Sequence, residues 1–274
     1  MAGSLYVVGT PIGNLEDMSV RAVRTLQEAN FIAAEDTRVT LKLLNHFEIK
    51  KPMLSYHEHN ARQKGGEILT RILNGENCAI VTDAGMPCIS DPGEDLVRLC
   101  AENGVDIKVI PGPSAAISAL AVSGLDTSRF VFDGFLNPQK NARLERLEQL
   151  KNEQRTLIFY EAPHKLTDTL EAMLQVLGDR KISLARELTK IYEEVVRTTL
   201  SRALELYREK APRGEFVLVV EGASQQQEQL SFEQALELVR ALVDKGEPLS
   251  KAAKDVAHQT GFKKGELYSR FLGQ

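Results

Sequence analysis

Short runs rich in valine and isoleucine alternate with helical patterns from the start of this 274-residue chain. Short continuous apolar runs are typical of strands buried on both faces, and their alternation with helices favours parallel pairing. We therefore predict a parallel α/β domain over residues 1–122. The expected strands are 4–9, 31–36, 76–83 and 105–112, and the expected helices are 19–29 (with Ser19 as N-cap), 39–47, 93–104 and 113–124.

A second series of strand and helix patterns follows residue 122. Proline and asparagine loosen the pattern within 125–143, before a charged helix at 141–153. The sequence predicts a second α/β domain over 123–224, a polar linker "SQQQEQ" at 224–229 and a small C-terminal helical subdomain over 230–274. The remaining expected elements are strands at 155–161, 181–189 and 215–223 and helices at 164–178, 231–245, 249–258 and 264–272.

Composition restricts the class of protein. With 43% hydrophobic and 26% charged residues, the chain can bury a real core, and a net charge of −4 does not favour general adhesion to nucleic acid. The three cysteines form no CxxC pair and indicate reduced thiols. The N-terminus lacks the pattern of a signal peptide, and no apolar run approaches the ~20 residues of a membrane span. We expect a soluble cytoplasmic protein that has no contact with a membrane.

Three loops rich in glycine and proline follow predicted strands: "GTPIGN" (9–14), "DAGMPCISDPG" (83–93) and "PGPSA" (111–115). Ligands of open parallel sheets bind beyond the carboxyl ends of the strands, where helix N-termini present free N–H groups. Any one of the three loops could be an ordinary turn between strand and helix. Together at one edge they predict a binding site.

The known glycine motifs do not match these loops. "GTPIGN" is neither G-x-G-x-x-G nor G-x-x-x-x-G-K-[ST], and no loop offers G-x-S-x-G. Hydride transfer, phosphoryl transfer and acyl transfer by serine are therefore not supported. The remaining expectation is a ligand held by backbone and small side chains, such as a cofactor with an adenine, a ribose and a zwitterionic tail.

Eight segments in order carry a resemblance to a known family: "VVGTPIGNLEDMS", "AAEDTR", "SYHEHN", "VTDAGMPCISDPG", "VIPGPSA", "FYEAPHK", "RELTKIYEEVVRTTL" and "RGEFVLVVEG". Together the chain resembles the tetrapyrrole methylase superfamily, and more closely its branch of bacterial 16S rRNA (cytidine-2'-O)-methyltransferases. Corrin and porphyrin methylases carry a G-x-G-P-G-D-type first loop and a G-D-P stretch, where this chain has "GTPIGN" and "DAG". That difference counts against a tetrapyrrole substrate.

The resemblance implies two α/β domains with S-adenosyl-L-methionine in the cleft between them, and a homodimer. The implied substrate is the small ribosomal subunit, methylated on the ribose of the decoding-region cytidine, conventionally 1402, of its 16S rRNA. Loops from both domains are implied to contact the cofactor. The residues carried over are Pro11, Asp83, Ala84, Gly85, Pro87, Ile89, Ser114, Ala115, Tyr160, Glu161, Arg213, Gly214 and Glu215.

A ribose hydroxyl is a weak nucleophile that gains from a general base. The candidate catalytic residues are Glu35, Asp36, Arg38 and His57. The first three could instead be an ion-paired strand end. His57 and His59 could bind a metal, although no third ligand is evident and no metal is expected, or they could lie in a substrate loop or a solvent-facing loop. Cys88 is expected to be a small apolar filler.

The C-terminal segment is basic in an otherwise acidic chain. From residue 251 onward it holds five lysine or arginine residues against two carboxylates, a net of +3, and two short helices with helix-turn-helix spacing around Gly261. An RNA-binding role is one interpretation, and a solvated capping subdomain is the other. The candidate RNA-binding residues are Lys190, Lys251, Lys263 and Lys264.

Two other functions remain open at this stage. One is an RNA-binding assembly factor that keeps the pocket without catalysis. The other is a methylase of a tetrapyrrole or another small molecule.

Overall fold

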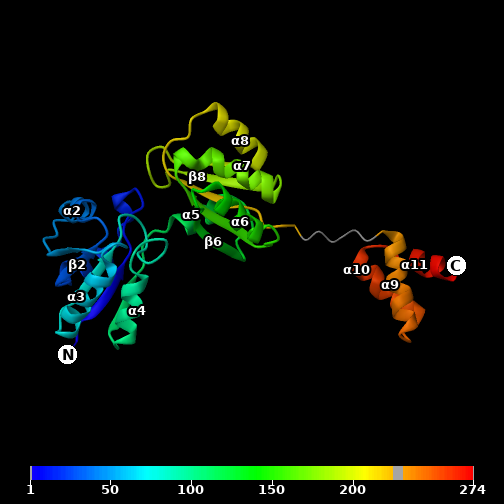
Figure 1. The fold of residues 1–274 in the computed structure, drawn as a ribbon, viewed down its shortest axis with the longest axis horizontal. Helices are drawn as coiled ribbons and strands as arrows, with labels where there is room; N and C mark the ends of the chain where they lie inside the picture. Colours follow the sequence, from blue (N-terminus) through cyan, green and yellow to red (C-terminus); the bar gives the residue numbers. More distant parts are fainter. Residues whose placement is uncertain (1, 225–230, 274) are drawn as a thin grey trace. The chain divides into compact units, whose positions relative to one another are not determined.

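The structure, a computed structural model, describes residues 2–224 and 231–273. The chain forms two compact units, Met1–Gly222 and Ala223–Gln274. The predicted boundary near residue 122 lies inside the first unit, which contains two sheets (Figure 1). The predicted linker lies, except for its first residue, outside the described residues.

The first sheet is parallel throughout, as the sequence predicts, with strand order β3-β2-β4-β1-β5. Alternate side chains face opposite sides of each strand, so that Cys78 and Ile80 join one core while Ala79 and Val81 join the other. The strands are β1 (Ser4–Val8), β2 (Phe31–Ala34), β3 (Met53–Ser55), β4 (Cys78–Val81) and β5 (Asp106–Ile110).

Two helices cover each face of this sheet. α1 and α2 pack on one face, and α3 and α4 on the other. Ser19 caps α1 as expected, since its side chain accepts a hydrogen bond from the Ala22 amide, and Asp36 caps α2 in the same way through Arg38. The helices are α1 (Val20–Glu28), α2 (Thr37–His46), α3 (Ala61–Leu73) and α4 (Glu94–Glu102), with a short 3-10 turn at η1 (Leu15–Asp17).

The second sheet is mixed, with order β6-β7-β10-β8-β9, in which β6 and β7 are parallel and the other pairs antiparallel. Helices α6, α7 and α8 cover one face. The elements are β6 (Phe130–Phe135), α6 (Lys140–Leu150), β7 (Thr156–Glu161), η2 (Pro163–Lys165), α7 (Leu166–Leu177), β8 (Lys181–Arg186), β9 (Glu194–Thr199), α8 (Leu200–Glu209) and β10 (Phe216–Val220).

Helix α5 (Ala115–Ser123) connects the two sheets. It follows β5 of the first sheet, yet its buried residues Ala116, Ala119 and Leu120 pack on the open face of the second sheet, against Ile158 and Val217. The N-terminus of α5 therefore lies where the carboxyl edge of the first sheet meets the second sheet.

The second compact unit consists of α9 (Phe232–Asp244), α10 (Leu249–Thr260) and α11 (Lys264–Leu272), close to the predicted helices. Its core includes Val239, Ala253, Val256 and Leu267. Gly261 ends α10 in the left-handed conformation at φ +80°, as the predicted turn requires. Among the described residues, no helix has the length and apolar character needed to cross a bilayer.

A backbone clamp joins the three loops at the carboxyl edge of the first sheet. Thr10 and Gly85 exchange backbone hydrogen bonds of 2.9 and 3.2 Å, and the Gly112 amide contacts the Met86 sulfur at 3.3 Å. A Cβ on Gly9 would lie 2.7 Å from backbone atoms of Gly112, so that only glycine permits this approach. The loops are thus held to one another and not only to their strands.

Replacing Gly9 by alanine tests the clamp. Because the new methyl group would meet backbone, we expect Gly9→Ala to lower the free energy of unfolding by about 1–3 kcal/mol. Gly66→Ala is the matched control, because Gly66 is exposed within α3 with no atom near its would-be Cβ. The control should raise stability by roughly 0.5–1 kcal/mol. Equal effects of the two substitutions in urea denaturation would contradict the clamp.

Candidate functional site

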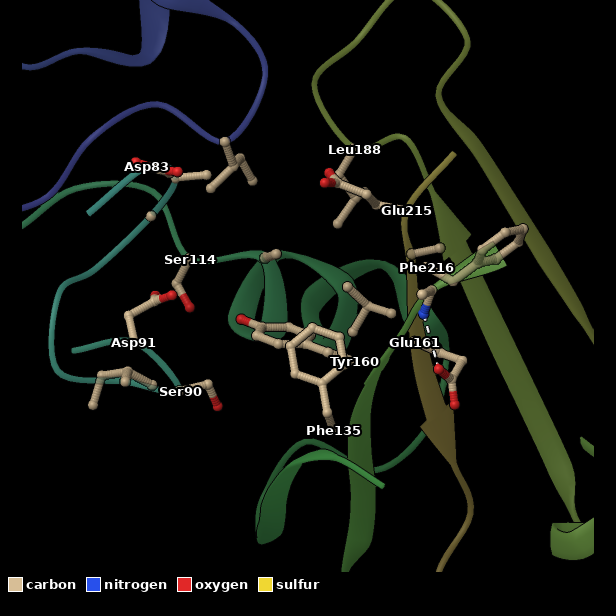
Figure 2. A pocket seen from close by; sticks show the side chains of 18 of the residues that line it. Asp83, Ser90, Asp91, Ser114, Phe135, Tyr160, Glu161, Leu188, Glu215 and Phe216 are labelled. Atoms are coloured by element: carbon tan, nitrogen blue, oxygen red, sulfur yellow. Dashed lines mark hydrogen bonds between the residues drawn. The ribbon is translucent and has the colours of Figure 1, made fainter. Parts of the chain in front are cut away.

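A pocket of about 500 Å³ lies between the carboxyl edge of the first sheet and the open face of the second (Figure 2). The first sheet contributes the loops after β1, β2 and β4, and the start of α5 forms part of the wall. The second sheet contributes residues of β6, β7, β8 and β10. This volume falls within the roughly 300–1,000 Å³ of small-molecule sites.

Three carboxylates from the first-sheet side give the pocket a negative end. Glu35 follows β2 and accepts a 2.5 Å hydrogen bond from the Thr82 hydroxyl, and Asp83 follows β4 and accepts one of 3.2 Å from the Asp36 amide. Burial raises the pKa of Asp83, and repulsion from Glu35 adds to the rise. Burial likewise raises the pKa of Asp91 to about 6, with Glu35 again contributing.

The N-terminus of α5 gives the pocket a positive partial charge. Ser114 is the N-cap, but its side chain makes no capping hydrogen bond, so its hydroxyl is not engaged with the helix. The Ala116 amide donates to the Tyr160 hydroxyl at 3.3 Å. Figure 2 shows Ser114 and Asp91 pointing toward one another. The start of a helix carries a positive partial charge that attracts anions, so this wall suits a carboxylate.

An ion-pair network forms the rim on the second-sheet side. The Lys190 ammonium donates to Glu187 at 2.9 Å and to Glu215 at 3.0 Å. The Glu187 carboxylate also accepts from the Glu215 amide at 2.9 Å. Hydrogen bonding to Lys190 lowers the pKa of Glu187. The two segments that carry Glu187 and Glu215 are therefore held together at the mouth of the pocket.

Glu161 lines the pocket but serves the local fold. It is buried, and its carboxylate accepts hydrogen bonds from the Ala162 amide at 2.9 Å and the Thr169 hydroxyl at 2.6 Å. Figure 2 marks the first of these contacts. The carboxylate is thus occupied in holding the turn between β7 and α7.

The structure brings most of the predicted site residues into this one pocket. The predicted cofactor, catalytic and RNA-binding residues that line it are Glu35, Asp83, Ala84, Gly85, Ile89, Ser114, Ala115, Tyr160, Glu161, Lys190 and Glu215. The predicted cofactor residues that do not line it are Pro11, Pro87, Arg213 and Gly214. Each lies one or two positions along the chain from a residue that does. Lys251, Lys263 and Lys264 belong to the second compact unit.

Three of the predicted catalytic residues lie outside the pocket lining. Asp36 pairs with the exposed Arg38 at 2.6 Å, and this hydrogen bond holds the pKa of Asp36 at about 2. His57 follows β3 and has its Nε2 atom 3.2 Å from the Asn60 side-chain nitrogen. Among the described residues there is no group of three or more His, Cys, Asp or Glu side chains arranged to hold a metal. Burial raises the pKa of the Cys88 thiol to about 11, consistent with a filler.

Sequence reasoning missed about half of the lining. Asp91 lies in the quoted loop but was not singled out, and the wall residues of β8 and β10 gave no signal beyond apolar character. The missed lining residues are Ile12, Met86, Ser90, Asp91, Phe135, Ala162, Pro163, His164, Ala185, Leu188, Phe216 and Val217.

Comparison with known proteins identifies the family. Residues 4–204 match the model of the Tetrapyrrole (Corrin/Porphyrin) Methylases. The chain is 48% identical to the Ribosomal RNA small subunit methyltransferase I of Halalkalibacterium halodurans, covering 97% of this chain and 94% of that protein. It is 45% identical to the protein of the same name from Escherichia coli O157:H7, covering 99% and 96%.

A solved structure supports the fold. The crystal structure of diphthine synthase superposes with a TM-score of 0.62 at 14% identity, covering 80% of this chain and 90% of that one. The chain belongs to the tetrapyrrole methylase family and, within it, to the family of the Ribosomal RNA small subunit methyltransferases I.

Proposed function

We propose that this protein transfers a methyl group from S-adenosyl-L-methionine to the ribose 2'-oxygen of cytidine 1402 in the 16S rRNA of the small ribosomal subunit. The chain is 45% and 48% identical to two small-subunit rRNA methyltransferases over nearly its whole length, which supports the substrate class. The observation that carries the chemistry is the pocket itself, which is lined by carboxylates and by the start of α5, where the N-cap Ser114 makes no side-chain capping bond.

The chemistry of the pocket walls fits this cofactor. Glu35 and Asp83 suit its cationic sulfonium and ammonium groups, and the α5 N-terminus at Ser114 suits its carboxylate. The apolar wall suits its adenine and consists of Ala185, Leu188, Phe216 and Val217. Of the five carboxyl groups in the lining, Glu161 is bonded to Ala162 and Thr169 and Glu215 to Lys190, which leaves Glu35 and Asp83 for a cation and Asp91 for a separate role.

S-adenosyl-L-methionine bound here would supply a methyl group on a cationic sulfur; the ribose oxygen would bond to the methyl carbon while the carbon–sulfur bond breaks and the sulfur leaves as a neutral thioether. In this protein the base is Asp91, whose pKa of about 6 leaves it ionised at neutral pH and able to accept a hydroxyl proton. The two walls align the groups and exclude water, which contributes to the rate through orientation. Arg38, exposed at the same sheet edge, suits a phosphate of the RNA strand.

The direct test is transfer to small subunits from a strain that lacks this enzyme. The purified protein is incubated with methyl-labelled S-adenosyl-L-methionine and subunits, naked 16S rRNA or a tetrapyrrole precursor, and the label is mapped by mass spectrometry. We expect a single labelled ribose at cytidine 1402, in the subunits. Label on the tetrapyrrole, or on a base, would overturn the proposal.

Asp91→Asn tests the base. We expect kcat to fall by about 10²–10⁴-fold, because general-base catalysis is lost. The kcat/KM of the unchanged enzyme should rise with pH through about 6, while the variant loses this step. Glu94→Gln is the matched control, a carboxylate on α4 whose side chain is 80% exposed. A variant with the pH step intact would exclude Asp91 as the base.

Stability provides a second readout for Asp91. Its folded-state pKa lies above the ordinary 3.8, so the stability gained from its protonated form is lost as pH rises through about 6. Asp91→Asn should therefore have a higher Tm than the unchanged protein at pH 7.5, and the difference should disappear below pH 3.8. A lower Tm for the variant at pH 7.5 would contradict this placement.

The second compact unit binds RNA through Lys263 and Lys264 in this proposal. The Lys263 side chain is 84% exposed with Glu266 at 3.7 Å, and Lys264 contacts the Ser250 hydroxyl at 3.1 Å. Both can therefore reach phosphates without breaking a strong pair. Lys251, paired with Glu247 at 2.8 Å, is less available.

Replacing Lys263 and Lys264 by alanine should weaken binding to the small subunit several-fold and reduce the slope of log K against log salt by about 1–2. Affinity for S-adenosyl-L-methionine should not change. Lys151→Ala is the control, since Lys151 is an exposed lysine that pairs with Glu148 at i,i+3. An unchanged salt slope would assign the second unit to a role other than RNA binding.

The protein acts in the cytoplasm as a homodimer in this proposal. Several large apolar side chains of the first unit are exposed, including Val20 at 85%, Ile191 at 95% and Tyr192 at 73%. A second copy that covers such side chains gains hydrophobic free energy. Sedimentation equilibrium should give twice the 30.4 kDa of one chain, and a 30.4 kDa species at micromolar concentration would contradict the dimer.

A further inference from the structure

Phe135 is an aromatic side chain at the mouth of the pocket that the proposed chemistry does not use. It is 61% exposed although it ends a strand of the second sheet and lines the cavity. A single exposed apolar residue is ordinary on a protein surface. In this case, however, three features of the surrounding structure place the ring at the pocket.

A bulge in β6 decides which face of the sheet Phe135 occupies. Phe132 pairs with Ile158, but the next pair is Gly134 with Phe159, so that Asp133 is an extra residue in β6. If β6 continued in register, with Asp133 opposite Phe159, Phe135 would pair with Glu161, whose side chain bonds to Thr169 on the helix-covered face. The one-residue shift places Phe135 opposite Tyr160 instead, on the pocket face.

The bulge in β6 lies beside the strained part of the loop after β4. Gly134 has φ +65°, and a Cβ there would lie 2.9 Å from the Ser90 hydroxyl. Ser90 (φ +61°) and Cys88 (φ +72°) are both non-glycine residues in the left-handed region. Such strain persists where the surrounding structure enforces it, frequently at ligand sites. The loop that carries Asp91 and the bulge that turns Phe135 are thus in direct contact.

The Tyr160 ring packs against the Phe135 ring and supports it. The Phe135 and Tyr160 rings lie 5.4 Å apart at an interplanar angle of 60°, and the Tyr160 hydroxyl is fixed by the Ala116 amide. Figure 2 shows both rings at the same side of the pocket, below Ser114. A supported ring with an exposed face is a surface on which a nucleobase can stack.

We propose that Phe135 stacks on the base of the nucleotide whose ribose is methylated, an inference that rests on the proposed function. The base and the 2'-hydroxyl belong to one nucleotide, and Phe135 and Asp91 are joined through the Gly134–Ser90 contact. The wall proposed for the adenine is a different one, since its residues Leu188 and Val217 are buried whereas Phe135 is exposed. Phe135 is thus a positioning residue for the substrate.

The test compares Phe135→Ala, Phe135→Leu and Phe135→Trp in methyl transfer to small subunits, with the affinity for S-adenosyl-L-methionine measured by calorimetry. Phe135→Ala should lower kcat/KM for subunits about 5- to 100-fold, the range expected for one stacked base, and Phe135→Trp should retain most of it. The affinity for the cofactor should stay within about twofold. Phe130→Leu, at the start of the same strand and 39% exposed, is the control and should leave both quantities unchanged.

Each outcome decides the matter. A Phe135→Ala variant as active as the unchanged protein would overturn the inference while leaving the proposed function in place. Loss of cofactor affinity in the same variant would overturn it too, because the ring would then serve the adenine. If the unchanged protein transfers no methyl group to subunits, the proposed function fails and the inference falls with it.

Discussion

The contact between the Gly9 and Gly112 backbones is the constraint on which the rest of the site depends. Parallel strands deliver their loops to one edge of a sheet, but an edge alone leaves those loops independent of one another. Here the loop after β4 is bonded to the loop after β1 through Thr10 and Gly85, and to the loop after β5 through Met86. Ordering a loop of glycine, proline and aspartate costs conformational entropy, and these shared bonds offset that cost. The start of α5 is thereby set against the pocket.

The pocket contains several features that generally lower the stability of a folded protein. Three carboxylates share one cavity, with the pKa values of Asp83 and Asp91 raised by burial and by repulsion from Glu35. Two non-glycine residues of the same loop, Cys88 and Ser90, adopt left-handed conformations. Groups that are costly in the free protein become favourable once a cation and a substrate occupy the site. Stability and activity are therefore expected to oppose one another at Asp91.

Much of the fold could be predicted because local signals agreed with the tertiary structure. The buried runs of β1 and β4 and the Ser19 cap are local, and so are the three helices of the second unit. The strands β3 and β6 and the helices α3, with its paired glycines, and α8 were not predicted. The position of α5 could not be read from its sequence, because "AAISALAVS" is apolar on every side and does not indicate which sheet it covers.

The parts of the site built from glycine- and proline-rich loops could be predicted from the sequence. The part that depends on the register between two strands could not. Glycine and proline signalled the loops, so Asp83, Gly85 and Ser114 were correctly expected to lie together, although their contacts with the cofactor stay a prediction. Phe135 was missed because one extra residue in β6 reverses the face it occupies, and that depends on pairing with β7. His57 was proposed from residue type, but it lies beyond the pocket lining on the neighbouring strand end.

Hydrogen–deuterium exchange with and without S-adenosyl-L-methionine tests the central claim most directly, namely that both sheets together bind the cofactor. We expect slower exchange at the loops after β1 and β4, at the start of α5, and equally in 160–164 and 185–190 of the second sheet. Exchange in α9–α11 should not change. Protection confined to one sheet, or located away from the clamped loops, would contradict the account.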